Sequence, residues 1–322
     1  MLYRRLGRSD IQVSALGMGC WAIGGPWDWS NGRSMGWGEV DDAESIRAIH
    51  KALEMGVNFF DSAANYGAGH SERILGQALA GRREDAVIAT KFGHIVDEAE
   101  KVVGEDHARV LENLRQDCEN SLRRLNTDYI DLYQLHAEDY PEERAPALME
   151  GLEELVSAGK IRWYGWSTDD PERAEIFAQG DHCASVQHRL NIFDRAEKML
   201  EVCDDYDIAS INKSPLGSGL LTGKYGPESK ITDPKQWRQR VDFGEERLVD
   251  RFNQLEALRE VLTSRGHTLA QAALAWIWAY HARAIPIPGF RNAAQVEENA
   301  GAATLGPLAE AQMQAIEGIL AG

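Results

Sequence analysis

The feature that most limits the fold of this chain is an alternation of short apolar segments with segments of helical spacing. Eight apolar segments have the length of buried strands, and each one precedes a helical segment. The predicted strands are 15–19, 57–60, 86–90, 129–135, 161–166, 184–187, 208–211 and 284–287. The predicted helices are 42–55, 72–79, 106–125, 144–157, a segment after 171, 196–206, 245–263, 269–280, 295–302 and 308–320.

This alternation favours an eight-stranded α/β barrel, the (β/α)8 TIM barrel. The competing architecture is a doubly wound sheet, which a Gly-x-Gly-x-x-Gly turn after the first strand would favour. The nearest match, 17–22, lacks the third glycine and leads into a loop rich in tryptophan. We therefore predict one barrel domain over 1–322, with an N-terminal β-hairpin formed by 4–7 and 12–16 and with extra C-terminal helices.

Charge and composition exclude several kinds of partner. The net charge of −17 argues against nucleic acid and against an anionic membrane surface. No apolar run approaches the roughly 18 residues of a membrane span, and the N-terminus lacks the apolar core of a secretory signal, so we expect a cytoplasmic protein. The four scattered cysteines show no metal-binding spacing, so we expect reduced thiols and no metal site. The sequence does not indicate an oligomeric state.

Polar residues lie at the strand ends where a barrel carries its catalytic groups. Asp61, Lys91 and His136 directly follow predicted strands, and Tyr66 lies in the turn after Asp61. Each has an ordinary structural explanation: a turn cap, a lysine reaching water, a hydrogen-bonded histidine and a loop anchor. Because a barrel would direct all four side chains to one rim, we favour a shared chemical role.

Together these groups can protonate a carbonyl oxygen. A tyrosine has a pKa of about 10, and a nearby ammonium such as that of Lys91 should lower it. Asp61 would hold the lysine in place, and His136 would orient the substrate oxygen. The chain has no Gly-x-Ser-x-Gly and no His-Glu-x-x-His motif. A hydride donor would supply the missing reactant.

Five segments in order along the chain resemble the signature segments of the aldo-keto reductases. They are 61–67, 89–93, 131–136, 214–224 and 285–291, and the resemblance extends over about 3–303. Within this family, the chain is similar to the bacterial branch that also includes the potassium-channel β subunits. The resemblance implies a barrel, NAD(P)H as the donor, and a tetrad of Asp61, Tyr66, Lys91 and His136 with Tyr66 as the general acid.

The resemblance also implies which residues bind the cofactor. Ser167 and Gln187 would bind the nicotinamide carboxamide. The pyrophosphate would be bound by Ser214, Leu216, Ser218 and Lys224. The last cofactor segment contributes Gly289, and the adenosine end would be surrounded by Arg291, Gln295, Glu298 and Asn299. A guanidinium at 291 can bind a 2′-phosphate with two hydrogen bonds, which predicts NADPH over NADH. The alternative is a solvated charge at a strand end.

Two positions depart from the family pattern. Thr168 replaces the usual asparagine, and Lys213 replaces an aromatic ring that stacks on the nicotinamide in many members. The tryptophans of 21–39 should lie near the pocket mouth, with Trp21 and Trp29 as substrate-pocket residues. We thus predict a reductase that converts small-molecule aldehydes and ketones to alcohols by hydride transfer from nicotinamide C4. The alternative is an NADP(H)-sensing interaction module with vestigial catalysis.

Overall fold

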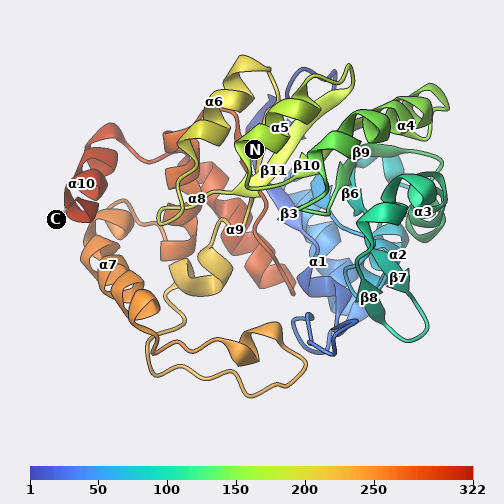
Figure 1. Ribbon diagram of the computed structural model, residues 1–322. Coiled ribbons are helices and arrows are strands. Elements are labelled where there is room, and N and C mark those ends of the chain that lie inside the picture. Colours follow the sequence, from blue (N-terminus) through green and yellow to red (C-terminus); the bar gives the residue numbers. More distant parts are fainter. Residues whose placement is uncertain (322) are drawn as a thin grey trace.

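The computed structural model describes residues 1–321, and its central element is a barrel of eight parallel strands surrounded by helices (Figure 1). The strands are β3 (Gly17–Gly19), β5 (Phe59–Asp61), β6 (Val87–Phe92), β9 (Ile130–Leu135), β10 (Ile161–Ser167), β11 (Cys183–Arg189), β12 (Ala209–Lys213) and β13 (Ala284–Pro286). They pair in the order β13-β12-β11-β10-β9-β6-β5-β3. A parallel bridge between Gly19 and Gly289 joins the first strand to the segment after the last one. The (β/α)8 prediction is confirmed.

Helices connect the strands on the outside of the barrel. They are α1 (Asp42–Glu54), α2 (His70–Ala78), α3 (Val110–Leu125), α4 (Ala145–Ser157), α5 (Pro171–Ala178), α6 (Glu197–Asp205), α7 (Glu246–Thr263), α8 (Leu269–Tyr280), α9 (Ala293–Leu305) and α10 (Glu310–Leu320). Local signals fix their ends: Asp41 accepts two backbone N–H groups at the start of α1, and Asn126 ends α3 in the left-handed conformation. A capping box of Thr268 and Gln271 begins α8.

Two strands continue one or two residues beyond their predicted ends. The predicted strands 57–60 and 86–90 stop before the first charged residue, whereas β5 includes Asp61 and β6 includes Lys91. Backbone pairing explains the difference, because Asp61 pairs with Ala89 and Lys91 with Gln134 in the parallel ladder. The two charged side chains are therefore held by the barrel wall and not by mobile loops.

The predicted N-terminal hairpin is present and closes one end of the barrel. Its strands β1 (Tyr3–Arg5) and β2 (Gln12–Ser14) are antiparallel. Leu6, Ile11 and Val13 are buried in one cluster with the interior side chains of the barrel strands, each contributing roughly 1.5–3 kcal/mol of apolar burial. Gly7 has φ 52°, and a Cβ there would lie 2.1 Å from a backbone oxygen. With this end filled, the opposite rim is left for polar groups.

Two sets of short elements at the open rim were not predicted from the sequence. The strands β4 (Asp28–Trp29), β7 (Ile95–Asp97) and β8 (Val102–Gly104) form a small separate sheet. Between β12 and α7, 3-10 turns occur at Gly217–Thr222 and Trp237–Arg240. A bridge from Trp37 to Gln236 joins this long segment to the tryptophan-rich loop. Strands of two or three residues are too short for a periodic sequence signal.

One helix is apolar on nearly every face. This is α8, which packs against α7, α9 and β13. Within residues 1–321, no helix reaches the combined length and hydropathy that a membrane crossing requires.

Candidate active site

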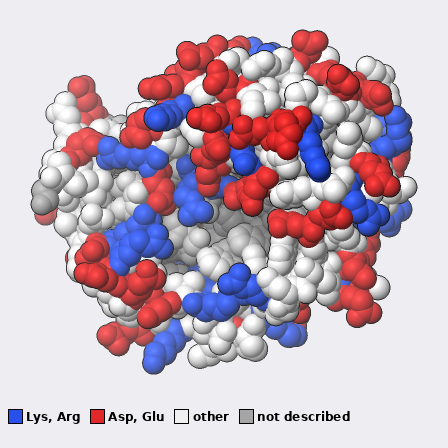
Figure 2. Space-filling view, in the orientation of Figure 1, with Lys and Arg blue, Asp and Glu red and all other residues white. Residues whose placement is uncertain are grey.

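A cavity of about 470 Å³ opens at the C-terminal ends of the barrel strands, and Figure 2 shows it as a hollow bordered by both basic and acidic side chains. Every residue predicted for the site except Lys91 lines this cavity. The lining includes Trp21, Trp29, Asp61, Tyr66, His136, Ser167, Gln187, Ser214, Leu216, Ser218, Lys224, Gly289, Arg291, Gln295, Glu298 and Asn299. Lys91 lies beneath the cavity wall, with its side chain fully buried.

The buried ion pair of Lys91 and Asp61 forms the base of the site. The Lys91 ammonium donates to Asp61 Oδ2 at 2.6 Å, to the Ser62 carbonyl at 2.8 Å and to the Tyr66 hydroxyl at 3.3 Å. Burial alone would lower the pKa of Lys91, but Asp61 and Tyr66 outweigh this effect and raise it. The lysine therefore stays charged next to the phenol.

The expected lowering of the Tyr66 pKa is wrong for the structure as described. Burial raises the pKa of this phenol by more than Lys91 lowers it. The lysine acts in the predicted direction, but desolvation of the phenolate is the larger effect. Tyr66 consequently keeps its proton at neutral pH.

His136 completes the group on the far side of the phenol. Its ring meets the Tyr66 ring edge to face, with 5.8 Å between centroids. Burial lowers the pKa of His136 well below 6.5, and the nearby cations of Lys91 and Lys213 add to this shift. A neutral imidazole at this position can donate one hydrogen bond to a substrate oxygen.

Two amide side chains hold Asp61 from the other side. Its Oδ1 accepts from Gln187 at 2.7 Å and from Gln134 at 3.1 Å. No site role was predicted for Gln134, although a signal exists: it lies two residues before His136 in β9, and alternate side chains of a strand share a face. Gln187 was predicted only to contact the nicotinamide carboxamide. In the structure, the Gln187 side-chain nitrogen donates to Asp61.

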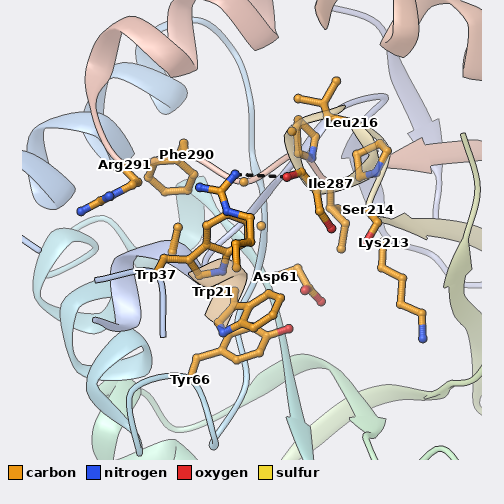
Figure 3. A pocket seen from close by; sticks show the side chains of 18 of the residues that line it. Trp21, Trp37, Asp61, Tyr66, Lys213, Ser214, Leu216, Ile287, Phe290 and Arg291 are labelled. Atoms are coloured by element: carbon orange, nitrogen blue, oxygen red, sulfur yellow. Dashed lines mark hydrogen bonds between the residues drawn. The ribbon is translucent and has the colours of Figure 1, made fainter. Parts of the chain in front are cut away.

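Tryptophans form one wall of the cavity (Figure 3). Trp21 stacks on Tyr66 with 6.0 Å between ring centroids, and Trp37 meets Trp21 edge to face at 5.3 Å. Trp237, for which no site role was predicted, also stacks on Trp21, with 6.0 Å between ring centroids. Because Trp237 is more than 200 positions away in the chain, only the tertiary fold brings it here.

The segment after β12 has a backbone suited to an anion. Ser214, Gly217, Ser218 and Gly219 all have positive φ, between 53° and 101°. Successive left-handed residues turn backbone N–H groups toward one side and form anion-binding concavities. The two serines adopt this conformation without the freedom of glycine, which is a strain often found at binding sites.

A buried arginine that was not predicted supports the same conclusion. Arg238 is 9% exposed, donates to the Ser218 carbonyl at 3.2 Å and lies 4.5 Å above the Trp37 ring. Its Nε has no hydrogen-bond partner, and no carboxylate of residues 1–321 pairs with it. A buried guanidinium without a counter-ion is unfavourable by itself. The residues present therefore fit the diphosphate of a dinucleotide.

The residues predicted for the adenosine end also bind their own loop. Gln295 accepts from the Arg291 amide at 2.8 Å, and Asn299 donates to the Gly289 carbonyl at 3.3 Å. The Arg291 guanidinium donates to the backbone oxygen of Glu39 and extends away from the centre of the cavity in Figure 3. It has no carboxylate partner within the part of the chain that the structure describes.

The two residues that depart from the family pattern, Thr168 and Lys213, both bond to neighbouring residues of the rim. Thr168 accepts from the Asp170 amide at 3.1 Å and does not line the cavity. Lys213 lines the cavity, but its ammonium pairs with Glu138 and lies 3.5 Å from Asp169. In Figure 3 its side chain extends away from Tyr66. The cation is thus tied to two neighbouring loops.

Comparison with known proteins agrees with this geometry. A family model described as the Aldo/keto reductase family matches residues 15–321. The NADH-specific methylglyoxal reductase of Escherichia coli (strain K12) is 33% identical over 312 residues, which cover 92% of each chain. The glycerol dehydrogenase AKR11B4 from Gluconobacter oxydans has a similar structure, with TM-score 0.82, 30% identity and coverage of 99% of this chain and 95% of that one.

A further structure of the same kind contains a bound cofactor. It is an aldo/keto reductase from Klebsiella pneumoniae in complex with NADP and acetate. Its TM-score is 0.69 at 25% identity, with 98% of this chain and 94% of that chain covered. The chain therefore belongs to the aldo/keto reductase family and is an oxidoreductase that acts on carbonyl compounds with a nicotinamide cofactor.

Proposed function

We propose that this protein reduces aldehydes and ketones with NADPH and that Tyr66 is the general acid. One observation carries the proposal: the Tyr66 hydroxyl lies 3.3 Å from the charged Lys91 ammonium on the wall of the cavity. A phenol that keeps its proton and has a cation beside it can protonate an oxygen as negative charge develops there.

Each tetrad side chain has a separate part in this chemistry. Bound NADPH supplies the hydride that reduces the carbonyl carbon. Tyr66 gives its proton to the carbonyl oxygen, and the Lys91 charge stabilises the phenolate that remains. Asp61 keeps Lys91 charged and in place. The neutral His136 imidazole donates a hydrogen bond that orients the carbonyl oxygen, and Trp21 shields Tyr66 from water on one side.

The cofactor would lie along the remaining lining of the cavity. We assign the nicotinamide carboxamide to Ser167 and Gln187. The diphosphate would meet the left-handed segment, and Arg238 would be its buried counter-ion. The residues of this stretch are Ser214, Leu216, Ser218 and Lys224, and those of the adenosine end are Gly289, Arg291, Gln295, Glu298 and Asn299.

The preference for NADPH depends on Arg291. Among residues 1–321, its guanidinium is bound only to a backbone oxygen, so its charge is available for a 2′-phosphate. Dissociation constants for NADPH and NADH should differ by at least tenfold in the native protein, and Arg291→Ala should remove most of that difference. Equal constants for the two cofactors in the native protein would reject the preference; the Escherichia coli relative is named as NADH-specific.

The reductase itself is tested by following NADPH oxidation with aldehydes such as methylglyoxal and 4-nitrobenzaldehyde. Tyr66→Phe should lower kcat by at least 10³-fold and leave NADPH binding unchanged. Tyr206→Phe is the matched control, because that hydroxyl bonds Glu175 on the surface. Substantial turnover in Tyr66→Phe would refute the general-acid assignment. NADPH binding without turnover on any carbonyl compound would instead favour a cofactor-sensing module.

A further inference from the structure

The orientation of His136 is not fixed by a hydrogen bond from its own ring. Its Nδ1 is buried and has no hydrogen-bond partner among residues 1–321. A functional histidine normally has one ring nitrogen bonded to a carbonyl or carboxylate, which selects the tautomer and holds the ring. Here two aromatic rings contact it instead: Tyr66, described above, and His94 with 5.0 Å between centroids and 75° between planes.

His94 is itself held firmly against His136. Its Nε2 lies 3.2 Å from Glu105 Oε1, and its ring meets Trp29 edge to face at 5.2 Å. Only 7% of its side chain is exposed. Gly93, with φ 109°, turns the chain sharply after β6, and a Cβ at that glycine would lie 3.1 Å from Leu135. The turn at Gly93 therefore places His94 next to His136.

We propose that His94 is a positioning residue for the active site: through ring packing it holds the His136 imidazole in the orientation that presents Nε2 to the cavity. This inference rests on the proposed function. Because Nδ1 is buried, Nε2 is the nitrogen left for a substrate oxygen. Edge-to-face contacts are directional, so the two perpendicular neighbours allow few ring rotations. Glu105 and Trp29 restrain the His94 ring, and the His94 ring in turn restrains the His136 ring.

Electrostatics give a second way to detect the contact. The charged or titratable groups that shift the His136 pKa are Lys91, His94 and Lys213, and the Tyr66 ring packs against the imidazole. After burial and Lys91, His94 is the next contribution that lowers the His136 pKa. Replacing His94 by phenylalanine keeps the ring and removes this contribution, so the His136 titration should move to higher pH.

The test uses His94→Phe, His94→Ala and Glu105→Gln in the full-length protein. His94→Ala should lower kcat about tenfold with the NADPH dissociation constant unchanged, since displacement of a group by about 1 Å can reduce rates up to 100-fold. His94→Phe should recover most of kcat, and Glu105→Gln should fall between the two. The matched control is His281→Ala, which breaks another histidine–carboxylate pair, with Asp204 at 3.3 Å, outside the cavity lining.

Nitrogen NMR of His136 in the cofactor-free protein gives a readout that does not depend on turnover. We expect a mixture of tautomers in His94→Ala and a raised His136 pKa in His94→Phe. Unchanged His136 signals in His94→Ala, or equal loss of kcat in His94→Phe and His94→Ala, would overturn the proposal. If the native protein had no reductase activity while the His136 signals changed as described, the proposed function would fail and the positioning role would stand.

Discussion

Within residues 1–321, two ion pairs of similar geometry are almost fully buried, and one of them lies at the proposed catalytic site. Lys91 and Asp61 meet at 2.6 Å on the barrel rim, and Arg124 and Glu72 meet at 2.5 Å between α3 and α2. The Glu72 carboxylate also accepts from Thr90 at 2.6 Å, and Arg124 also bonds Glu98 and Ser121.

The rim pair differs in its contact with the cavity, which Asp61 lines. Lys91 keeps a long contact to the Tyr66 hydroxyl, and buried polar atoms of Gln134, His136 and Asn65 nearby have no partner in residues 1–321. Unpaired buried groups are unfavourable and are tolerated where a ligand will meet them. We conclude that two equally buried ion pairs can have different roles: Asp61 and Tyr66 line the cavity, whereas Glu72 and Arg124 do not.

The largest expected effect is on catalysis at the rim pair. Lys91→Met keeps the length of the side chain and removes the charge that stabilises the phenolate. We expect kcat to fall by about 10²–10³-fold, with the NADPH dissociation constant within threefold of native. Steady-state kinetics and fluorescence titration with NADPH measure the two quantities. A kcat within fivefold of native would show that the rim pair is structural like its counterpart.

Removal of the Arg124 cation should lower stability and leave catalysis nearly unchanged. Arg124→Met leaves Glu72 buried without a counter-ion, so the free energy of unfolding should fall by about 3–5 kcal/mol, with kcat at 25 °C within twofold of native. Chemical denaturation gives the first value. Arg123→Met is the control, because this exposed arginine also pairs with Glu98 and should contribute less than about 1 kcal/mol. Equal losses in both variants would contradict the contrast.

A smaller effect should follow loss of an amide that holds Asp61. Gln134→Leu removes the donor at 3.1 Å and leaves Gln187 and Lys91 in place. We expect kcat to fall about tenfold, since one hydrogen bond to a charged group contributes roughly 1.5–3 kcal/mol, and the unfolding free energy to change little. The exposed Gln116 serves for a matched Gln→Leu control. A native kcat in Gln134→Leu would mean that Asp61 needs only Lys91.

The smallest expected effect is on the pH dependence of stability, and it comes from Asp117, which lies near Arg124 and Glu72. Burial raises the pKa of Asp117 from 3.8 to about 6. The folded protein thus binds this proton more tightly than the unfolded chain, so stability from this group is greatest below pH 4 and is lost as pH rises to about 6. Asp117→Asn should flatten this slope and raise the unfolding free energy at pH 7.5 by roughly 1–3 kcal/mol. Denaturation at pH 4.5 and 7.5 measures both; a slope identical to native would assign the proton to another group.

The sequence alone determined the barrel, because the eight alternations of apolar strands and amphipathic helices are encoded locally in hydrophobic periodicity. It also placed Asp61, Lys91 and His136 at the correct rim, since strand polarity in a barrel follows from topology. The strand ends were less accurate, because backbone pairing continues through charged residues that interrupt the apolar pattern.

Only the tertiary structure decided which side chains meet. Arg238 reaches the cavity, and Trp237 reaches Trp21, from a segment without periodicity. His94 reaches His136 through a turn at Gly93. The direction of the Tyr66 pKa shift likewise depended on burial, which no spacing rule supplies. The physical reason is common to these cases: contacts between distant segments and desolvation are properties of the packed molecule, whereas periodicity and strand order are written along the chain.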